Sequence, residues 1–436
     1  MSGCPFSALT RRSFFKSAGG GIGVLAASTG LGSIATRLAN ASEKSTQSAG
    51  AVVPHDKSAT IPFWDQHQAG IITPQQAHTY FASFDLVAKN RDEVIKLLKA
   101  WTEASARMTE GQTAAPLSKD LSHPAADGGE AIGLSPSRLT LTFGFGSGLF
   151  SKAGVDRYGL VKLRPEALVE MPKFHGDELM EAKTGGDLSV QACADDPQVA
   201  FHAVRQLVRL ATDVAQVRWA QTGFASGGDG SETPRNLMGF KDGTQQPKES
   251  EHDHFVWVDK KGPRWMQGGS YLVTRRIRIA LEHWDSTDVE FQEQVIGRHK
   301  DSGAPLGQAH ERETLNLAAV DKDGNSVIPD NSHVRLASIE ANGGAQILRR
   351  GYSYNDGVNF TAERWPPWRQ GMEYDAGLFF VSYQSDPRTG FIKMFENMAK
   401  LDALNQFVTH VGSGLFACPP GAKKGEYIGQ KLFEMV

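Results

Sequence analysis

The stretch TYFASFDLVA (Thr79 to Ala88), followed closely by RDEVIKLLKAWTEASARMTE (Arg91 to Glu110), decides the fold class. The first stretch predicts a strand, and the second spaces its apolar residues for one face of an amphipathic helix. RLTLTFGFG (Arg138 to Gly146) predicts another strand by its alternation. DPQVAFHAVRQLVRLATDVA (Asp196 to Ala215) predicts a second helix, with Asp196 as its cap and a proline at its first position.

The second half of the chain repeats this order of elements. GSYLVTRRIRIAL (Gly269 to Leu281) and AGLFFVSYQ (Ala376 to Gln384) predict strands, whereas STDVEFQEQVIGRHK (Ser286 to Lys300) and LDALNQFVTHV (Leu401 to Val411) predict helices. Each half therefore contains strand–helix–strand units without the regular alternation of a doubly wound sheet. The pattern predicts two α+β domains with antiparallel sheets, divided near residue 235.

Composition and charge exclude some classes of protein. The chain has 436 residues, of which 22% are charged and 40% hydrophobic, so it is an ordinary globular sequence with room for two to three domains. The first 41 residues carry four basic residues and no acid, so their removal takes the net charge from −3 to about −7. A mildly acidic body argues against nucleic acid as a partner.

The N-terminus resembles a twin-arginine (Tat) export signal. TRRSFFK (Thr10 to Lys16) precedes an apolar run rich in glycine and alanine, and ANA (Ala39 to Ala41) has the pattern of a cleavage site. We expect residues 1–41 to be a signal peptide and residues 42–74 a mature N-terminal tail. The alternative is a membrane anchor, but the apolar run is interrupted and no later run reaches 18 apolar residues. No stable membrane span is expected after signal removal.

The three cysteines are Cys4, Cys193 and Cys418. One bridge between Cys193 and Cys418 is compatible with the sequence, but two buried thiols are favoured because nothing supports the bridge. The sequence contains no CxxC or CxxCH motif, which argues against covalent haem attachment and against a thiolate zinc site.

Two motifs suggest ligands that their context does not support. TFGFGSG (Thr142 to Gly148) lacks the spacing of a dinucleotide-binding loop, so its glycines are expected to permit close backbone approach in a sheet. ESEHDHF (Glu249 to Phe255) offers three carboxylates and two imidazoles for a divalent metal, those of Glu249, Glu251, His252, Asp253 and His254. Adjacent residues cannot all face one ion, so a solvated acidic loop is the favoured interpretation.

Three further stretches carry residues of interest. KDGTQQP (Lys241 to Pro247) is a turn signal that contains Asp242, IPDNSHVRLAS contains His333, and LRRGYSY (Leu348 to Tyr354) contains two adjacent arginines. Each has an ordinary structural explanation when it is taken alone: a bend, a hydrogen-bonded histidine and a pair of surface arginines.

Taken in order, these stretches resemble the dye-decolorizing (DyP-type) haem peroxidase family. The resemblance rests on GFKDG (Gly239 to Gly243), on His333 before Arg-Leu-Ala and on LRRGYSY, with TFGFG, GLFFVSYQSD and GSGLFACPPG as further matches. It covers roughly residues 75–432. The export signal narrows it to the Tat-exported deferrochelatase/peroxidase branch of the Efe iron-uptake system.

The resemblance implies an α+β fold of two ferredoxin-like domains with antiparallel sheets (dimeric α+β barrel type). Residues 75–235 would form the N-terminal domain and residues 236–436 the haem-binding domain. One haem b per chain, a periplasmic location, a homodimer and partners of an iron-uptake system are expected with it.

The resemblance also implies the site. His333 matches the axial ligand of the iron, Asp242 the distal acid and Arg349 the distal arginine, with Arg350 pointing elsewhere. Gly243, Thr244 and Gln245 would line the haem. Asp330 is a candidate hydrogen-bond partner of His333.

One departure from the family pattern concerns the haem propionates. The family commonly has Asn-Pro-Arg where this chain has Ser338, Ile339 and Glu340, and a glutamate there would repel a propionate. The propionate contact is therefore expected to fall to Arg275, Arg276 or Arg278.

These residues imply a haem peroxidase that reduces hydrogen peroxide and oxidises dye-like or phenolic donors. Electrons would pass at the haem edge or through Trp257, Trp265 or Tyr352, although buried aromatics usually serve only the core. Release of iron from haem as a substrate, with the porphyrin left intact, is a second implied activity. The alternative from another class is a non-catalytic periplasmic haem-binding or haem-delivery protein.

Overall fold

The computed structural model describes residues 56, 58–120, 122–225, 233–362 and 370–436. The predicted export signal at 1–41 lies outside these residues, as do residues 42–55 and 57 of the predicted tail. Within the described residues, no helix combines the length and the apolar character that a membrane crossing needs.

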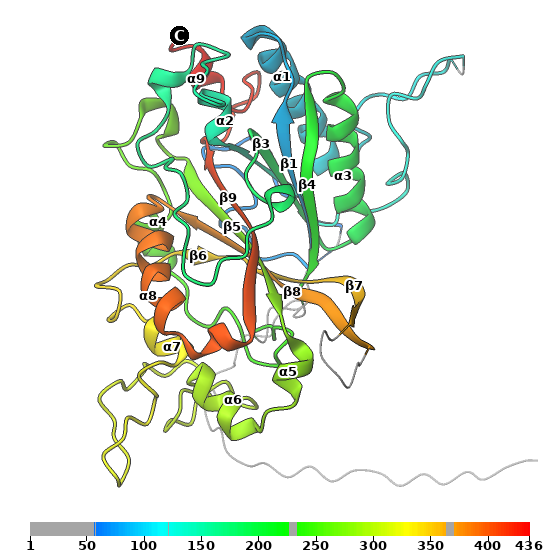
Figure 1. Ribbon diagram of the computed structural model, residues 1–436. Coiled ribbons are helices and arrows are strands. Elements are labelled where there is room, and N and C mark those ends of the chain that lie inside the picture. Colours follow the sequence, from blue (N-terminus) through cyan, green and yellow to red (C-terminus); the bar gives the residue numbers. More distant parts are fainter. Residues whose placement is uncertain (1–55, 57, 121, 226–232, 363–369) are drawn as a thin grey trace, which may run out of the picture. The chain divides into compact units, whose positions relative to one another are not determined.

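Strands of the described chain form one antiparallel sheet in the order β5-β9-β2-β3-β1-β4-β7-β8-β6 (Figure 1). β5 also pairs with β8, so the sheet closes on itself, and β6 extends from β8. The strands are β1 (His78–Leu86), β2 (Thr140–Phe145), β3 (Leu188–Ala194), β4 (Ala215–Phe224), β5 (Ser270–Ile279), β6 (Leu348–Arg349), β7 (Tyr352–Ala362), β8 (Gln370–Gln384) and β9 (Val408–Cys418).

The closed sheet consists of two four-stranded halves. Strands β2-β3-β1-β4 come from the first half of the chain, and β9-β5-β8-β7 come from the second. The halves join by short pairings, Phe145 with Ala417 and Phe224 with Ser353. Both halves contribute to one apolar cluster, in which Phe81 and Trp219 of the first half pack with Phe416 of the second.

Helices cover both halves of the sheet, and α3 packs on β3 and β1 beside α1 (Figure 1). The α-helices are α1 (Arg91–Thr109), α2 (Ser147–Phe150), α3 (Pro197–Leu210), α4 (His252–Phe255), α5 (Leu281–Asp285), α6 (Val289–Ile296), α7 (His333–Leu336), α8 (Lys393–Leu401) and α9 (Gln430–Phe433). Short 3₁₀ turns lie at Val161–Leu163, Glu181–Lys183, Glu249–Glu251, Arg264–Met266 and Ala403–Gln406, with a π turn at Arg388–Ile392.

Side chains at the helix starts explain where the longer helices begin. The Asn90 side chain accepts a hydrogen bond from the backbone N–H of Glu93 at the start of α1. The predicted cap of α3 is confirmed, because the Asp196 side chain accepts from Gln198 and Val199 and a proline follows it. α3 ends earlier than predicted, and its last predicted residue already belongs to β4.

The helix predicted at Leu401 to Val411 is wrong. α8 ends at Leu401, a single 3₁₀ turn follows, and β9 begins at Val408. Asp402 accepts a hydrogen bond from Leu404 N–H and so caps this turn rather than a longer helix. The Val-Thr-His-Val run favours a strand because β-branched side chains pack well there, and pairing with β5 takes the whole segment into the sheet.

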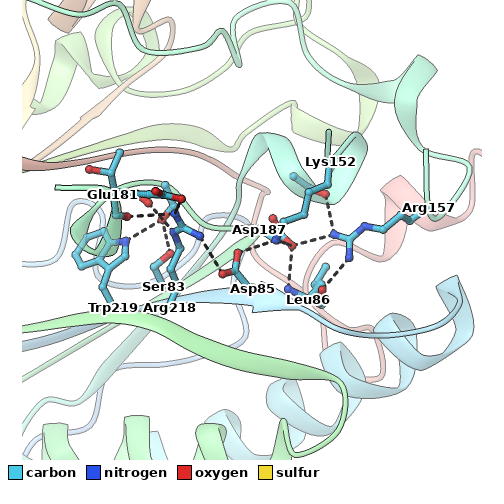
Figure 2. A network of polar contacts seen from close by, with 12 residues as sticks. Ser83, Asp85, Leu86, Lys152, Arg157, Glu181, Asp187, Arg218 and Trp219 are labelled. Atoms are coloured by element: carbon cyan, nitrogen blue, oxygen red, sulfur yellow. Dashed lines mark hydrogen bonds and ion pairs between the residues drawn. The ribbon is translucent and has the colours of Figure 1, made fainter. Parts of the chain in front are cut away.

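A network of ion pairs fastens the long connection between β2 and β3 onto the sheet (Figure 2). Lys152 Nζ lies 2.7 Å from an Asp85 oxygen on β1 and 3.0 Å from an Asp187 oxygen. Arg157 also pairs with Asp187 at 2.9 Å, and Arg218 on β4 pairs with Asp85 at 3.0 Å. Asp187 is nearly fully buried, so this network fixes the connection to the N-terminal half.

Three predictions about individual motifs can be compared with the structure. The TFGFGSG glycines do permit close approach, since a Cβ at Gly146 would stand 2.0 Å from the carbonyl oxygen of Gly186. Cys193 and Cys418 are both buried free thiols, as favoured. ESEHDHF is not a loop: it forms a 3₁₀ turn followed by α4, with the Glu251 carboxylate accepting from Lys248 N–H.

Candidate functional site

A large cavity lies in the C-terminal half, between the sheet and the segments around α7 and α8. The volume of the cavity is about 1640 Å³, which includes open solvent at its mouth. Neighbouring strands supply an apolar wall, because Ile277 on β5 faces Leu378 on β8 in register and Ile279 follows on the same side. Further apolar lining comes from Phe380, Phe391, Met394, Phe395 and Met398. A largely apolar ligand fits such a lining.

His333 is the first residue of α7, and it lines the cavity with its side chain 32% exposed. Its Nδ1 lies 2.7 Å from an oxygen of the buried Asp402 carboxylate. Burial lowers the pKa of His333, but the Asp402 carboxylate raises it, and the net result is a pKa above the ordinary value. In the neutral ring Nδ1 donates to Asp402, so the lone pair of Nε2 is free to bind a metal.

The predicted partner of His333, Asp330, is therefore wrong. Asp330 is an exposed residue that accepts a hydrogen bond from Ser326 Oγ and lies 3.6 Å from Arg335. Asp402 takes its place from a position 69 residues further along the chain, at the turn between α8 and β9.

Asp242 and Arg349 meet in the same cavity. An Asp242 oxygen lies 3.0 Å from Arg349 Nη1, and each side chain is about 30% exposed, Arg349 at 30% and Asp242 at 31%. Asp242 donates its backbone N–H to the carbonyl of Pro234 at 2.8 Å, and Gly243 follows with a φ of 110°, a left-handed conformation that glycine adopts without strain. The turn therefore directs Asp242 toward the arginine. The charges of Asp242 and Arg349 both influence His333.

Gln246 holds the backbone of Arg349 on both sides. Its side-chain oxygen accepts from Arg349 N–H at 2.9 Å, and its side-chain nitrogen donates to the Arg349 carbonyl at 3.0 Å. The amide thus pairs with β6 as a neighbouring strand would. This fixes the position of Arg349 without occupying its guanidinium.

Glu311 holds the other side of the Asp242 turn. Its carboxylate accepts hydrogen bonds from Lys241 Nζ at 2.8 Å, from Thr244 Oγ1 at 3.0 Å and from Thr233 Oγ1. Burial raises the pKa of Glu311, but the hydrogen bonds from Lys241, Thr233 and Thr244 lower it more, so the net pKa is below the ordinary value. Two residues that flank Asp242 are therefore fastened to one carboxylate.

We expect Glu311 to stabilise the protein above its unfolded-state pKa of about 4.3, where the carboxylate is charged in both states. The contribution is lost as the pH falls through the lowered pKa of the folded state. Glu311→Gln should therefore be less stable than the parent at neutral pH, and the difference should shrink toward acid pH. Urea unfolding across this range measures it, and a difference that grew toward acid pH would contradict this role.

The remaining predicted site residues divide into two groups. Gly243, Thr244, Gln245 and Ile339 line the cavity. Ser338 and Glu340 are absent from the lining: Ser338 is buried and its Oγ accepts from Ala341 N–H, whereas Glu340 is exposed.

The three arginines predicted to reach a propionate do not line the cavity. Arg275 is buried against Asp177 and His410, Arg276 pairs with Asp356 and Asp375, and Arg278 pairs with Glu373. Each already has a carboxylate partner, so that prediction is wrong.

Arg350 does point elsewhere, as expected. It donates to the Thr73 carbonyl and to Gln76 Oε1, away from its neighbour Arg349. Trp257, Trp265 and Tyr352 are buried core residues outside the cavity lining. Their proposed part in electron transfer stays a prediction.

Sequence reasoning missed four residues of the site: Asp402, Gln246, Glu311 and Arg298. Gln246 lies inside the KDGTQQP stretch, yet nothing in the sequence shows that its side-chain amide bonds to the backbone of a residue far along the chain. Glu311 and Asp402 lie far along the chain from their partners, and no spacing in the sequence relates them.

Comparison with protein families matches nearly the whole described chain. The sequence model for the N-terminal part of Dyp-type peroxidases matches residues 68–225, and the one for the C-terminal part matches residues 233–423.

Individual relatives agree with the family match. A dye-decolorizing peroxidase of Thermobifida fusca is 41% identical over 84% of this chain and 84% of its own length. A deferrochelatase of Shigella flexneri is 36% identical over 93% of this chain and 96% of its own. Ferric DtpA from Streptomyces lividans superposes with a TM-score of 0.78 at 40% identity, over 87% of this chain and 98% of its own.

Proposed function

The chain belongs to the Dyp-type peroxidase family, and from this premise we propose that its cavity binds haem b with His333 as the iron ligand. The protein is a haem-dependent peroxidase. The observation that carries the assignment of residues is the contact of Asp242 with Arg349 in the cavity that His333 also lines.

The residues present fit haem. The cavity wall is largely apolar, and His333 lines it with the lone pair of Nε2 free when Nδ1 donates to Asp402. Asp402 supplies the carboxylate that orients such an imidazole and strengthens its donation to a metal. The contact of Asp242 with Arg349 places an acid and an arginine beside this largely apolar wall.

Haem, when bound, supplies the redox-active iron at which hydrogen peroxide is reduced. Asp242 takes a proton from one oxygen of hydrogen peroxide and returns it to the other, so that the second oxygen leaves as water. A base that becomes the acid must keep one position through both transfers. The 3.0 Å contact with Arg349 and the Glu311 contacts to its flanking residues support that position.

Arg349 stabilises the negative charge that grows on the leaving oxygen. Its guanidinium is always charged, and Gln246 holds its backbone so that the donors need no reorganisation during the reaction. A non-catalytic haem carrier would have no use for this pair, which is why the catalytic function is preferred to the carrier.

The donors that return electrons are phenolic or dye-like molecules under this proposal. To test it, the protein is loaded with haem and supplied with peroxide and a phenol, and donor oxidation is followed with time. No Soret band after haem addition would remove the haem assignment, whereas a bound haem without peroxide turnover would favour the carrier.

Release of iron from haem is proposed as a second activity of the same cavity, supported by the likeness to a deferrochelatase over most of both chains. Product analysis with haem as substrate decides it. Free protoporphyrin is the expected product, and a ring-opened tetrapyrrole or unchanged haem would contradict it.

Further proposals concern the fold and the location. In each half the strands follow the order expected of a ferredoxin-like sheet, which supports two such domains at residues 75–235 and 236–436. Export by the Tat route to the periplasm, a homodimer and partners in iron uptake are proposed from the N-terminal motif and from the relatives.

A further inference from the structure

Arg298 is a buried arginine in the wall of the haem cavity. It is only 8% exposed, and it lines the cavity. It follows Gly297, which ends α6 in a left-handed conformation. A Cβ at Gly297 would stand 2.5 Å from Val334 Cγ2, so the chain approaches the neighbour of His333 at this point. Arg298 therefore sits close to the segment that presents the iron ligand.

The basic side chains of the cavity differ in how their charges are compensated. Lys241 pairs with Glu311 at 2.8 Å, Arg349 with Asp242 at 3.0 Å and His333 with Asp402 at 2.7 Å. His410 accepts a hydrogen bond from Arg275, and its pKa is lowered by burial and by that positive charge, so it is neutral. Within the described chain, Arg298 has no carboxylate at ion-pair distance.

One edge of the Arg298 guanidinium is free. Nη1 donates to the Gly303 carbonyl at 2.7 Å and to the Glu311 carbonyl at 2.9 Å, which fixes the orientation of the group. Nε and Nη2 have no acceptor among the described residues. These two nitrogens form the edge that binds a carboxylate through two parallel hydrogen bonds.

A buried cation without a counter-ion costs free energy. The pKa of Arg298 responds to this burial. Burial lowers the pKa of Arg298, the Glu311 carboxylate opposes this, and the charge of Arg349 lowers it further. An anion placed in the cavity would offset the penalty.

We propose that Arg298 binds a carboxylate of the bound tetrapyrrole, a haem propionate. It would replace the arginine that the family commonly has at the position of Glu340. This rests on the proposed haem site. Haem b carries two carboxylates, and Ser338, Glu340, Arg275, Arg276 and Arg278 are all absent from the cavity lining. Among the described residues that line the cavity, Arg298 is the cation without a carboxylate partner, so it is available to a propionate.

The test removes each partner of the interaction in turn, the propionate charges of the ligand and the guanidinium of Arg298. The protein is loaded with haem b or with its dimethyl ester, which lacks the carboxylate charges, and release to a haem scavenger is timed in the same detergent buffer. Arg298→Gln should speed the release of haem b by about 10- to 100-fold, the range of a hydrogen bond to a charged group. It should leave release of the ester unchanged.

Controls separate this role from a structural one. Arg298→Lys keeps the charge without the fork, so its effect on haem b should be smaller. Arg278→Gln, which loses only a pair with Glu373 outside the cavity, should release both ligands as the parent does. Equal acceleration with haem b and with the ester would assign Arg298 a structural role and overturn the proposal, as would no acceleration. Failure of the parent to bind haem would instead overturn the proposed function.

Discussion

Replacing Asp242 by asparagine is expected to lower peroxide turnover by about 10²- to 10⁴-fold while haem stays bound. Asparagine has nearly the same shape and still accepts a hydrogen bond from Arg349, so the turn around it should persist. What it cannot do is take a proton from one peroxide oxygen and return it to the other. Stopped-flow measurement of the reaction with peroxide, together with the Soret band, checks both parts of the expectation.

Asp330→Asn is the matched control for this change. Asp330 is an exposed aspartate three residues before His333 and is absent from the cavity lining, so its replacement should leave turnover unchanged. Full turnover in Asp242→Asn would contradict the proton-transfer role. Loss of haem from that variant would point to a structural role instead.

Replacing Arg349 by leucine is expected to lower peroxide turnover by about 10²- to 10³-fold, the range found when a donor to a developing negative charge is removed. Gln246 bonds to the backbone of Arg349, so β6 should keep its place when the side chain changes. The steady-state rate at saturating peroxide and the rate at low peroxide are measured separately, because a lost transition-state interaction lowers both equally.

Arg349→Lys keeps the charge but not the planar fork, so we expect it to recover only part of the rate. Arg349→Leu with an unchanged rate would remove the electrostatic role. A change in the rate at low peroxide alone would limit Arg349 to binding peroxide.

Much of the fold was predictable because local signals and tertiary structure agree there. The apolar spacing of α1 and the cap and proline of α3 mark these helices, and packing on the sheet preserves them. The segment 401–411 shows where the agreement ends. Its sequence permits a helix or a strand, and pairing of β9 with β5, a long-range contact, decides for the strand.

The site was predictable only as far as the family resemblance carries it. Asp242, His333 and Arg349 were named from ordered motifs, and the structure brings all three to one cavity. Asp402 was missed because an aspartate in a turn looks the same whether it caps that turn or orients a histidine, and here it does both. Arg298 was missed because its place in the cavity wall, without a carboxylate at ion-pair distance among the described residues, arises from tertiary packing and leaves no mark in the sequence.

A crystal structure of the haem-loaded protein would show directly whether His333 holds the iron. We predict iron bonded to His333 Nε2, with the Asp242–Arg349 pair on the opposite face of the ring. Iron held by another residue, or His333 and Asp242 on the same face, would contradict it.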